Sequence, residues 1–258
     1  MRYNKVRKTK KKLGLFLVSL AIIILVTLVG VTLFIKDDIQ SISGVNKKGS
    51  EVTENTANNV PVKALADWKL ILVNTENPIP EDYTLETRPL PNGLTFDTRA
   101  YDNLIAMLND GKNEGLTFVV CSAYRTIELQ TSLFKAQVAK QQHKGLSDKE
   151  AYNVAKTIVA LPGTSEHNVG LAVDIVALDY QRLDDGYADT PEAIWLKQNS
   201  DKYGFILRYP ANKEKTTKIM YEPWHFRYVG TDHALEMNRL NLCLEEYIEY
   251  LRDAALAV

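Results

Sequence analysis

Two short segments in the second half of the chain contain residues that could perform chemistry. The first is Ser-Glu-His-Asn-Val-Gly-Leu-Ala-Val-Asp at 165–174, and the second is Glu-Pro-Trp-His at 222–225. Together they supply two imidazoles, His167 and His225, and the carboxylate of Asp174. Two nitrogens and one oxygen are ligands that catalytic zinc sites use, with the fourth coordination position left to water. The segments therefore predict a catalytic zinc centre.

Glu222 stands three residues before His225 and is the candidate general base. Pro223 restricts how the chain enters the next strand, so the Glu222 carboxylate is expected outside that strand. From there it could take a proton from water without becoming a ligand. A lone histidine is more often structural, and this is the interpretation for His143 and His233, which lie in polar helical sequence.

The predicted ligands are expected on two short strands. Residues 171–176, Leu-Ala-Val-Asp-Ile-Val, are typical of a buried strand, in which Asp174 faces away from its two apolar neighbours. A carboxylate in such surroundings is costly unless it is paired or metal-bound. Gly170 permits a sharp turn between His167 and this strand. The second strand is expected at 225–229, where His225 alternates with aromatic residues.

Capping residues and apolar periodicity mark the other elements. Helices are expected after Asp97, after Thr126, from Ala151 to Ala160 after a Ser147–Glu150 capping box, from Pro191 toward residue 204 and from about 232 to 256. Further strands are expected at 116–121 and 205–208. Because helices and strands do not alternate regularly, we predict an α+β fold, with a small antiparallel sheet that carries the zinc site and is surrounded by helices.

The two segments resemble those of the VanY-type D-alanyl-D-alanine carboxypeptidases. These are zinc peptidases of the group that includes lysostaphin-like endopeptidases and hedgehog domains. The resemblance spans roughly residues 67–230 and includes Val-Val-Cys-Ser-Ala-Tyr-Arg-Thr at 119–126 and Tyr-Gly-Phe-Ile-Leu-Arg-Tyr-Pro at 203–210. It implies His167, Asp174 and His225 as zinc ligands, Glu222 as catalytic base, Arg125 as the cation facing the scissile carbonyl, and Gln130 and Ser165 as substrate contacts.

Arg125 suits that role because it follows an apolar strand and precedes a helix. A guanidinium held there could stabilise the oxyanion that forms when water attacks an amide. The alternative for Arg125 is a surface ion pair. Gln130 could equally be an amide on a helix surface, and Ser122 a turn residue.

The resemblance implies removal of the C-terminal D-alanine from peptidoglycan stem peptides, and so a role in cell-wall remodelling. A link to glycopeptide resistance stays open. An L,D-carboxypeptidase that trims tetrapeptide to tripeptide is one alternative, and a non-catalytic cell-wall-binding module is another. A serine-type enzyme would use Ser-x-x-Lys, which Ser132 and Lys135 match, but Ser132 is expected mid-helix and neither Ser-Asp-Asn nor Lys-Thr-Gly occurs.

The N-terminal part predicts a membrane anchor. Residues 1–12 form a basic tail with seven basic and no acidic residues, and residues 13–35 carry no charge. As a helix of ~1.5 Å per residue this run spans a bilayer core, with the basic tail in the cytoplasm. A cleaved signal peptide is the alternative, although no small-x-small cleavage site is evident. The chain is thus expected in the cell membrane, single-pass, with its catalytic domain extracellular.

Residues 36–66 are predicted to be a flexible linker, because they are polar and lack periodicity. Residues 67–258 would then form one zinc D,D-carboxypeptidase domain, expected to act as a monomer.

All 32 acidic residues follow position 36, whereas eight of the 31 basic residues do not. This acidic balance argues against nucleic acid as a partner. Cys121 and Cys243 could pair outside the cell, but two buried free thiols are favoured.

Overall fold

The computed structural model of the protein describes residues 60–257. The predicted basic tail, membrane anchor and most of the linker lie outside these residues. Among the residues described, no helix has the length and apolar character needed to cross a membrane.

Helices and 3₁₀ helices make up most of the regular structure. The α-helices are α3 Val60–Leu65, α4 Tyr101–Asn113, α5 Ile127–His143, α6 Asp148–Ala155, α7 Pro191–Asn199, α8 Glu214–Thr217, α9 Thr231–Leu240 and α10 Leu244–Leu256. The 3₁₀ helices are η1 Trp68–Leu70, η2 Glu166–Val169, η3 Asp185–Asp189 and η4 Ser200–Tyr203. The strands are β1 Thr87–Pro89, β2 Thr95–Asp97, β3 Phe118–Ser122, β4 Ala172–Ala177, β5 Phe205–Leu207 and β6 His225–Tyr228.

The central sheet is antiparallel throughout and has the strand order β3-β4-β6-β5. Strands β1 and β2 form a separate antiparallel pair. In the central sheet Asp174 of β4 lies directly opposite His225 of β6, so two predicted ligands come from neighbouring strands. The predicted α+β class, with a small antiparallel sheet among helices, is confirmed.

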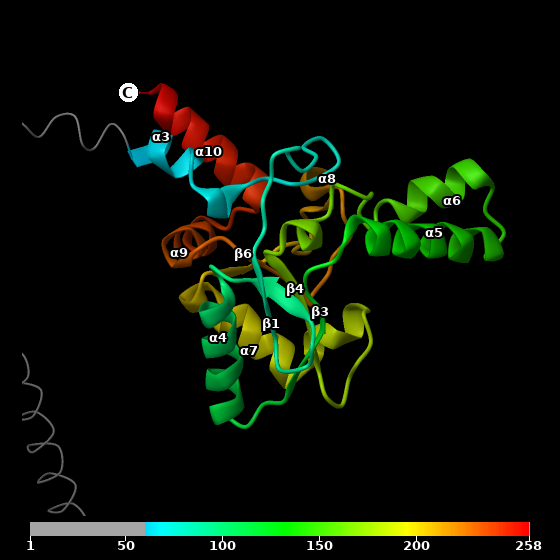
Figure 1. Ribbon diagram of the computed structural model, residues 1–258, viewed down its shortest axis with the longest axis horizontal. Coiled ribbons are helices and arrows are strands. Elements are labelled where there is room, and N and C mark those ends of the chain that lie inside the picture. The colour runs from blue at the N-terminus through cyan, green and yellow to red at the C-terminus, as the bar shows by residue number, and fades with distance from the viewer. Residues whose placement is uncertain (1–59, 258) are drawn as a thin grey trace, which may run out of the picture. The chain divides into compact units, whose positions relative to one another are not determined.

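The two faces of the sheet differ in chemistry because side chains alternate along each strand. Val173 and Ile175 of β4 and Phe226 of β6 belong to the main hydrophobic core. Helices α4 and α7 cover this apolar face and contribute Leu104 and Leu196 to the same core (Figure 1). The opposite face of the sheet carries the alternate residues of β4 and β6, which include Asp174 and His225.

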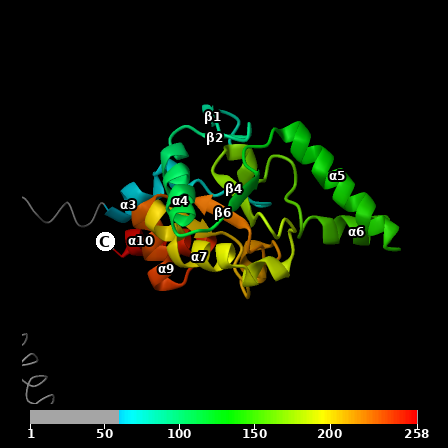
Figure 2. The same ribbon diagram turned by 90° about the horizontal axis from the view of Figure 1, so that it is seen from below.

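Helices α5 and α6 lie side by side and extend away from the sheet (Figure 2). The predicted caps of both helices are present. The Thr126 hydroxyl accepts a hydrogen bond from the Leu129 amide at 3.2 Å. Ser147 and Glu150 form the predicted capping box at the start of α6. Thr126 therefore begins α5 immediately after Arg125, which holds that side chain beside the end of β3.

Three predicted helices differ from the observed ones. Asp97 does not cap α4, because its carboxylate accepts hydrogen bonds from the amide and guanidinium of Arg99. The helix expected to begin after Ser147 ends at Ala155 rather than near residue 160. The last helix is not continuous: α9 and α10 are separated at Asn241, which adopts a left-handed conformation with φ 53°. Asparagine tolerates this conformation better than most residues.

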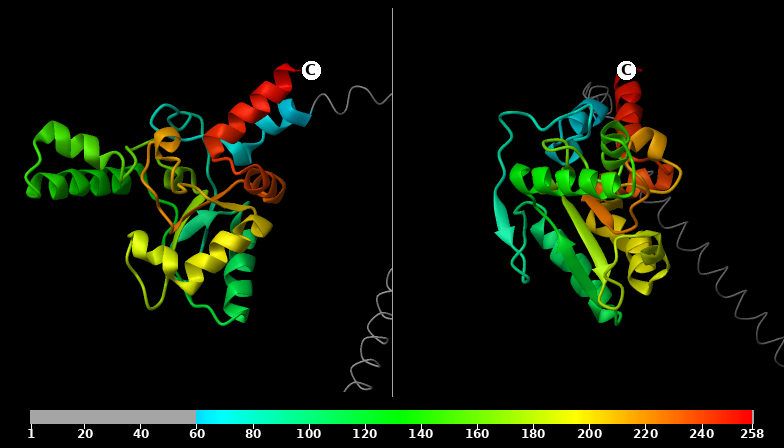
Figure 3. Two further views of the ribbon diagram at one scale, coloured as in Figure 1. Left: turned by 180° about the vertical axis from the view of Figure 1, so that it is seen from behind. Right: turned by 90° about the vertical axis from the view of Figure 1, so that its right-hand side faces the viewer.

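The end of the predicted linker is partly helical. Residues 60–65 form α3, which packs against α10 near the C-terminus (Figure 3). The last residues of the predicted linker therefore belong to the folded domain. Cys121 and Cys243 are both free thiols, as favoured, but Cys121 is exposed rather than buried.

Candidate metal centre

Three elements bring the predicted ligands together. His167 lies in η2, Asp174 in β4 and His225 in β6, and all three side chains are buried. Gly170 turns the chain between His167 and β4 in a left-handed conformation with φ 73°, which glycine adopts without strain. One potential ligand atom from each residue lies within 4.8 Å of the others. Among residues 60–257, His167, Asp174 and His225 are the side chains grouped closely enough to hold a metal ion.

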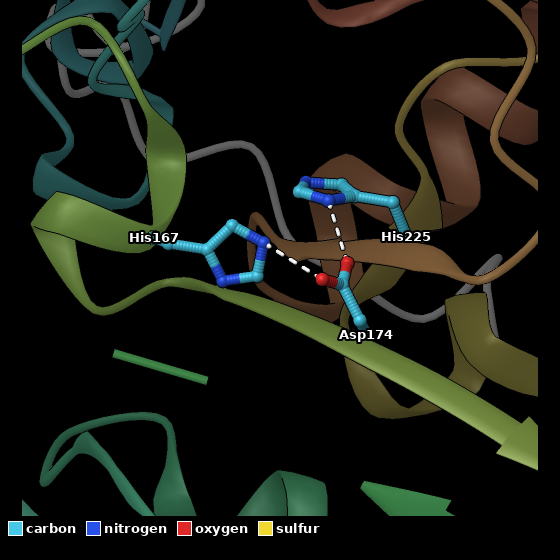
Figure 4. A group of neighbouring side chains, drawn as sticks. All are labelled: His167, Asp174 and His225. Atoms are coloured by element: carbon cyan, nitrogen blue, oxygen red, sulfur yellow. Dashed lines mark hydrogen bonds and ion pairs between the residues drawn. The ribbon is translucent and has the colours of Figure 1, made fainter. Parts of the chain in front are cut away.

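Asp174 lies between the two histidines, which both point toward it (Figure 4). Its Oδ2 is 3.3 Å from His167 Nε2, and its Oδ1 is 2.9 Å from His225 Nδ1. The three donor atoms thus converge from three directions. Such convergence of two imidazole nitrogens and a carboxylate fits zinc, which these three residues would hold.

The hydrogen bonding of His167 also fits a metal. Its Nδ1 lies 2.6 Å from the carbonyl oxygen of Ala123. A carbonyl only accepts, so this nitrogen carries the proton and the Nε2 lone pair faces Asp174. That Nε2 atom is buried and has no hydrogen-bond partner among residues 60–257. A buried nitrogen held in this way is typical of a metal ligand whose second nitrogen is fixed by the protein.

The charges of the site follow from burial and from mutual contact. Burial, assisted by Arg125, lowers the pKa of His167 to about 4, so this ring is neutral at pH 7. Burial opposes ionisation of Asp174, but the two histidines hold its pKa well below the usual range. Burial also opposes charging of His225, but the hydrogen bond with Asp174 and the nearby carboxylate of Glu166 raise its pKa to about 9. In the metal-free protein His225 is therefore protonated at pH 7.

Glu222 lies beside the ligands and outside β6, as expected. Its carboxylate oxygen is 3.7 Å from His225 Nδ1, and its side chain is almost fully buried. Burial, with a contribution from Asp174, raises the pKa of Glu222 to about 8. A carboxyl group whose pKa lies near neutral pH can both accept and return a proton.

Arg125 lies against Asp174 rather than in a surface ion pair. Its Nη2 donates to Asp174 Oδ2 at 2.8 Å, and its guanidinium is largely buried. Nε donates to the Ser122 hydroxyl at 2.8 Å, and Nη1 donates to Gln130 Oε1 at 3.0 Å. Three partners therefore fix the orientation of this cation at the edge of the site.

The two predicted substrate contacts are both buried. Gln130 is not on the helix surface: it accepts from Arg125 and donates through Nε2 to the Ala160 carbonyl at 2.8 Å. It thereby positions Arg125. Ser165 precedes η2, and its hydroxyl makes no capping hydrogen bond. Contact of either residue with a substrate stays a prediction.

Residues outside the predicted set also reach the site. Glu166, Arg208 and Arg227 are fully buried behind His225, and each arginine forms an ion pair with Glu166. Sequence reasoning missed them, because charged residues next to short strands are usually exposed. One signal was available: Arg227 stands two residues after His225 in β6 and so shares its face of the sheet.

The remaining candidates are ordinary structural residues. The Ser132 hydroxyl donates to the Glu128 carbonyl within α5, as mid-helix serines commonly do. His233 lies in α9 and outside the ligand group, and its Nδ1 is 3.0 Å from the Tyr247 hydroxyl. The contact with Tyr247 supports the structural interpretation of His233. The hydrogen bond of Ser132 within α5 gives no support to a serine-type mechanism.

Comparisons with known proteins agree with this geometry. The family model for VanY, D-alanyl-D-alanine carboxypeptidase, matches residues 93–231. A D-alanyl-D-alanine carboxypeptidase of Enterococcus faecalis is 41% identical over 207 residues, which cover 78% of this chain and 75% of the relative.

Two solved structures show the same fold. One is a vancomycin-resistance D,D-pentapeptidase, a VanY variant in complex with Zn(II), with 42% identity, a TM-score of 0.65, and coverage of 70% of this chain and 99% of that chain. The other is the LD-carboxypeptidase LdcB, with 35% identity, a TM-score of 0.58, and coverage of 69% and 84%. With the ligand geometry and the family match in agreement, this chain belongs to the VanY family of D-alanyl-D-alanine carboxypeptidases.

Proposed function

We propose that this protein is a zinc-dependent carboxypeptidase that removes the C-terminal D-alanine from peptidoglycan stem peptides. The buried group of His167, Asp174 and His225 carries the proposal, because Glu222 and Arg125 flank it. A non-catalytic wall-binding module would have no use for a buried carboxyl group beside the ligands with its pKa raised to about 8. Burying such a group is otherwise costly.

We assign the three ligands to holding zinc, which when bound supplies a Lewis acid and lowers the pKa of water. Glu222 accepts the proton of the attacking water and returns it to the nitrogen of the departing D-alanine. Arg125, held by Ser122 and Gln130, presents its guanidinium to the developing oxyanion. Ser165 and Gln130 are proposed as substrate contacts, and Gln130 also positions Arg125.

An L,D-carboxypeptidase is the second candidate, and the similarity to LdcB favours keeping it. The ligands and the base would be the same, because both reactions hydrolyse an amide next to a terminal D-alanine. The two differ in the stereocentre before the scissile bond. We favour the D,D activity, since identity to the D,D-pentapeptidase is higher, at 42% against 35%.

We further propose that residues 13–35 anchor the protein in the cell membrane and that residues 36–59 extend toward the catalytic domain. The uncharged run and the preceding basic residues support this. The domain would then act outside the cell, on the peptidoglycan next to the membrane.

The test uses the full-length chain, purified in detergent and loaded with zinc. It is incubated separately with a pentapeptide and a tetrapeptide wall stem, and products are followed by mass spectrometry. Loss of one alanine from the pentapeptide alone establishes the D,D activity. Loss from the tetrapeptide alone establishes the L,D activity, and loss from neither would contradict the proposed enzyme.

A further inference from the structure

A buried cluster of charged side chains lies behind His225, and the proposed mechanism leaves it without a role. It consists of Glu166 in η2, Arg208 after β5 and Arg227 in β6, each at most 1% exposed. Arg208 Nε donates to Glu166 Oε1 at 2.6 Å, and Arg227 Nη1 donates to the same oxygen at 2.8 Å. Removing three ionised groups from water is expensive, so the arrangement calls for an explanation.

The two oxygens of Glu166 have different surroundings. Oε1 accepts from both arginines, whereas Oε2 has no hydrogen-bond partner among residues 60–257. Oε2 faces His225 Nε2 at 3.6 Å, and this nitrogen also lacks a partner. The opposite nitrogen of the ring, Nδ1, faces Asp174 at 2.9 Å. His225 therefore lies between Glu166 on one side and the metal site on the other.

Charge compensation alone does not account for this geometry. A carboxylate that only neutralised two guanidinium groups would use both of its oxygens, because bidentate pairing is stronger. Here both arginines converge on one oxygen and turn the other toward the ring of a predicted ligand. Arg227 is in turn held by the backbone carbonyls of Lys69 and Ile71, at 2.9 and 2.8 Å.

We propose that Glu166 is a positioning residue that sets the tautomer of His225. Its Oε2 accepts the proton of Nε2 and so leaves the Nδ1 lone pair directed at the metal. A neutral imidazole carries one N–H, and the group that accepts it decides which nitrogen is free to bind. Outer partners of this kind orient ligands and raise their basicity.

His167 has the reverse arrangement, because its Nδ1 proton is held by the Ala123 carbonyl and its Nε2 faces the site. The two histidines would therefore bind one metal through different nitrogens. Arg208 and Arg227 act through Glu166, since they hold its carboxylate in the orientation that reaches His225.

The test rests on the proposed zinc site and begins with Glu166→Gln in the full-length chain. The two arginines offer only donors, so they retain the amide oxygen and turn the NH₂ group toward His225 Nε2. That nitrogen must then accept, which places the ring proton on Nδ1. Zinc affinity, measured by competition with a chelator, should fall about 10- to 100-fold.

Glu245→Gln is the matched control. Glu245 accepts from Arg208 at 2.6 and 2.8 Å, on the side of the guanidinium away from His225. The change removes the same charge from the same arginine, and zinc affinity should stay within about threefold of wild type. Equal affinities for Glu166→Gln and Glu245→Gln would overturn the proposal. A wild-type protein that binds no zinc would instead contradict the proposed function.

A second measurement leaves Glu166 and the two arginines unchanged. With His143 and His233 replaced by Gln, ¹⁵N-histidine labelling leaves the two ligand rings in the NMR spectrum of the zinc-loaded protein. The proposal expects one ring protonated on Nδ1, His167, and one protonated on Nε2, His225. Two rings with the same protonated nitrogen would overturn it.

Discussion

At the scale of single residues, Asp174 organises the metal-free site. It contacts both histidines and Arg125 within 3.3 Å, so its charge is balanced before a metal arrives. This pairing explains how a carboxylate lies inside a buried strand at tolerable cost. It also keeps the three donor atoms close together, so that little rearrangement is needed when a metal binds.

Glu222 is the residue whose removal should separate catalysis from metal binding. Glu222→Ala should lower kcat by at least about 100-fold, because proton transfer by a positioned side chain contributes that much. Zinc content, measured by atomic emission, should stay near one per chain. His225→Ala is the comparison and should lose the metal. Loss of zinc from Glu222→Ala would show that Glu222 is a ligand.

Zinc affinity should depend on pH through His225. Its pKa is raised to about 9, so below that pH a proton must leave before the ring can bind a metal. Apparent affinity should therefore rise by up to about tenfold per pH unit from pH 6 to pH 9. His167, with its pKa lowered to about 4, adds no dependence in this range. Chelator competition at several pH values checks this, and a flat profile would contradict it.

At the scale of elements, the turn at Gly170 sets the distance between His167 and Asp174. The backbone there is left-handed, and an added Cβ would lie 2.9 Å from Leu85 Cδ1. A short connection between η2 and β4 thus depends on a residue without a side chain. Both ligands would shift if this turn opened.

Gly170→Ala should lower the free energy of unfolding by ~1–2 kcal/mol from backbone strain, and further from the contact with Leu85. It should also weaken zinc binding, because His167 moves relative to β4. Gly93→Ala is the control: its φ is 85°, but nothing lies within 4 Å of the added Cβ. Urea unfolding and zinc competition measure both effects. An unchanged zinc affinity in Gly170→Ala would show that the turn does not position the ligand.

At the scale of the whole molecule, the metal site depends on segments that are distant in sequence. Arg208 links Glu166 to Glu245 in α10, and Arg227 binds the backbone near η1. The first and last parts of the described chain therefore pack around the buried charges behind His225. Both ends should contribute to the stability of the domain.

The N-terminal segment should determine where the protein resides. The full-length chain is expected in the membrane fraction, because residues 13–35 are long and uncharged. Replacing Ile24 and Leu25 by Lys places two charges mid-run, each costing about 3 kcal/mol in a bilayer. This variant should leave the membrane fraction, whereas Ser43→Lys in the linker should not. Equal fractionation of both variants would contradict the anchor.

Much of the site was predictable from sequence because its chemistry is local. His167, Gly170 and Asp174 lie within eight residues, so the turn and the strand that present two ligands could be recognised from residue types alone. The caps at Thr126 and Ser147 are equally local, since each needs only a side chain and an amide three residues later. The α+β class followed from the same short-range patterns.

Other features depended on contacts that only the tertiary structure supplies. The break at Asn241 lies within a run with apolar periodicity, and Met237 of α9 and Leu244 of α10 pack into one hydrophobic cluster on either side of it. Asp97 had the residue type of a cap, but Arg99 engages its carboxylate instead. The pairing of Asp174 with His225, 51 residues later, exists because β4 and β6 are neighbours in the sheet. Sequence therefore determined which groups can bind a metal, whereas the fold decided which of their atoms face it, because hydrogen-bond partners such as Ala123 and Glu166 come from distant segments.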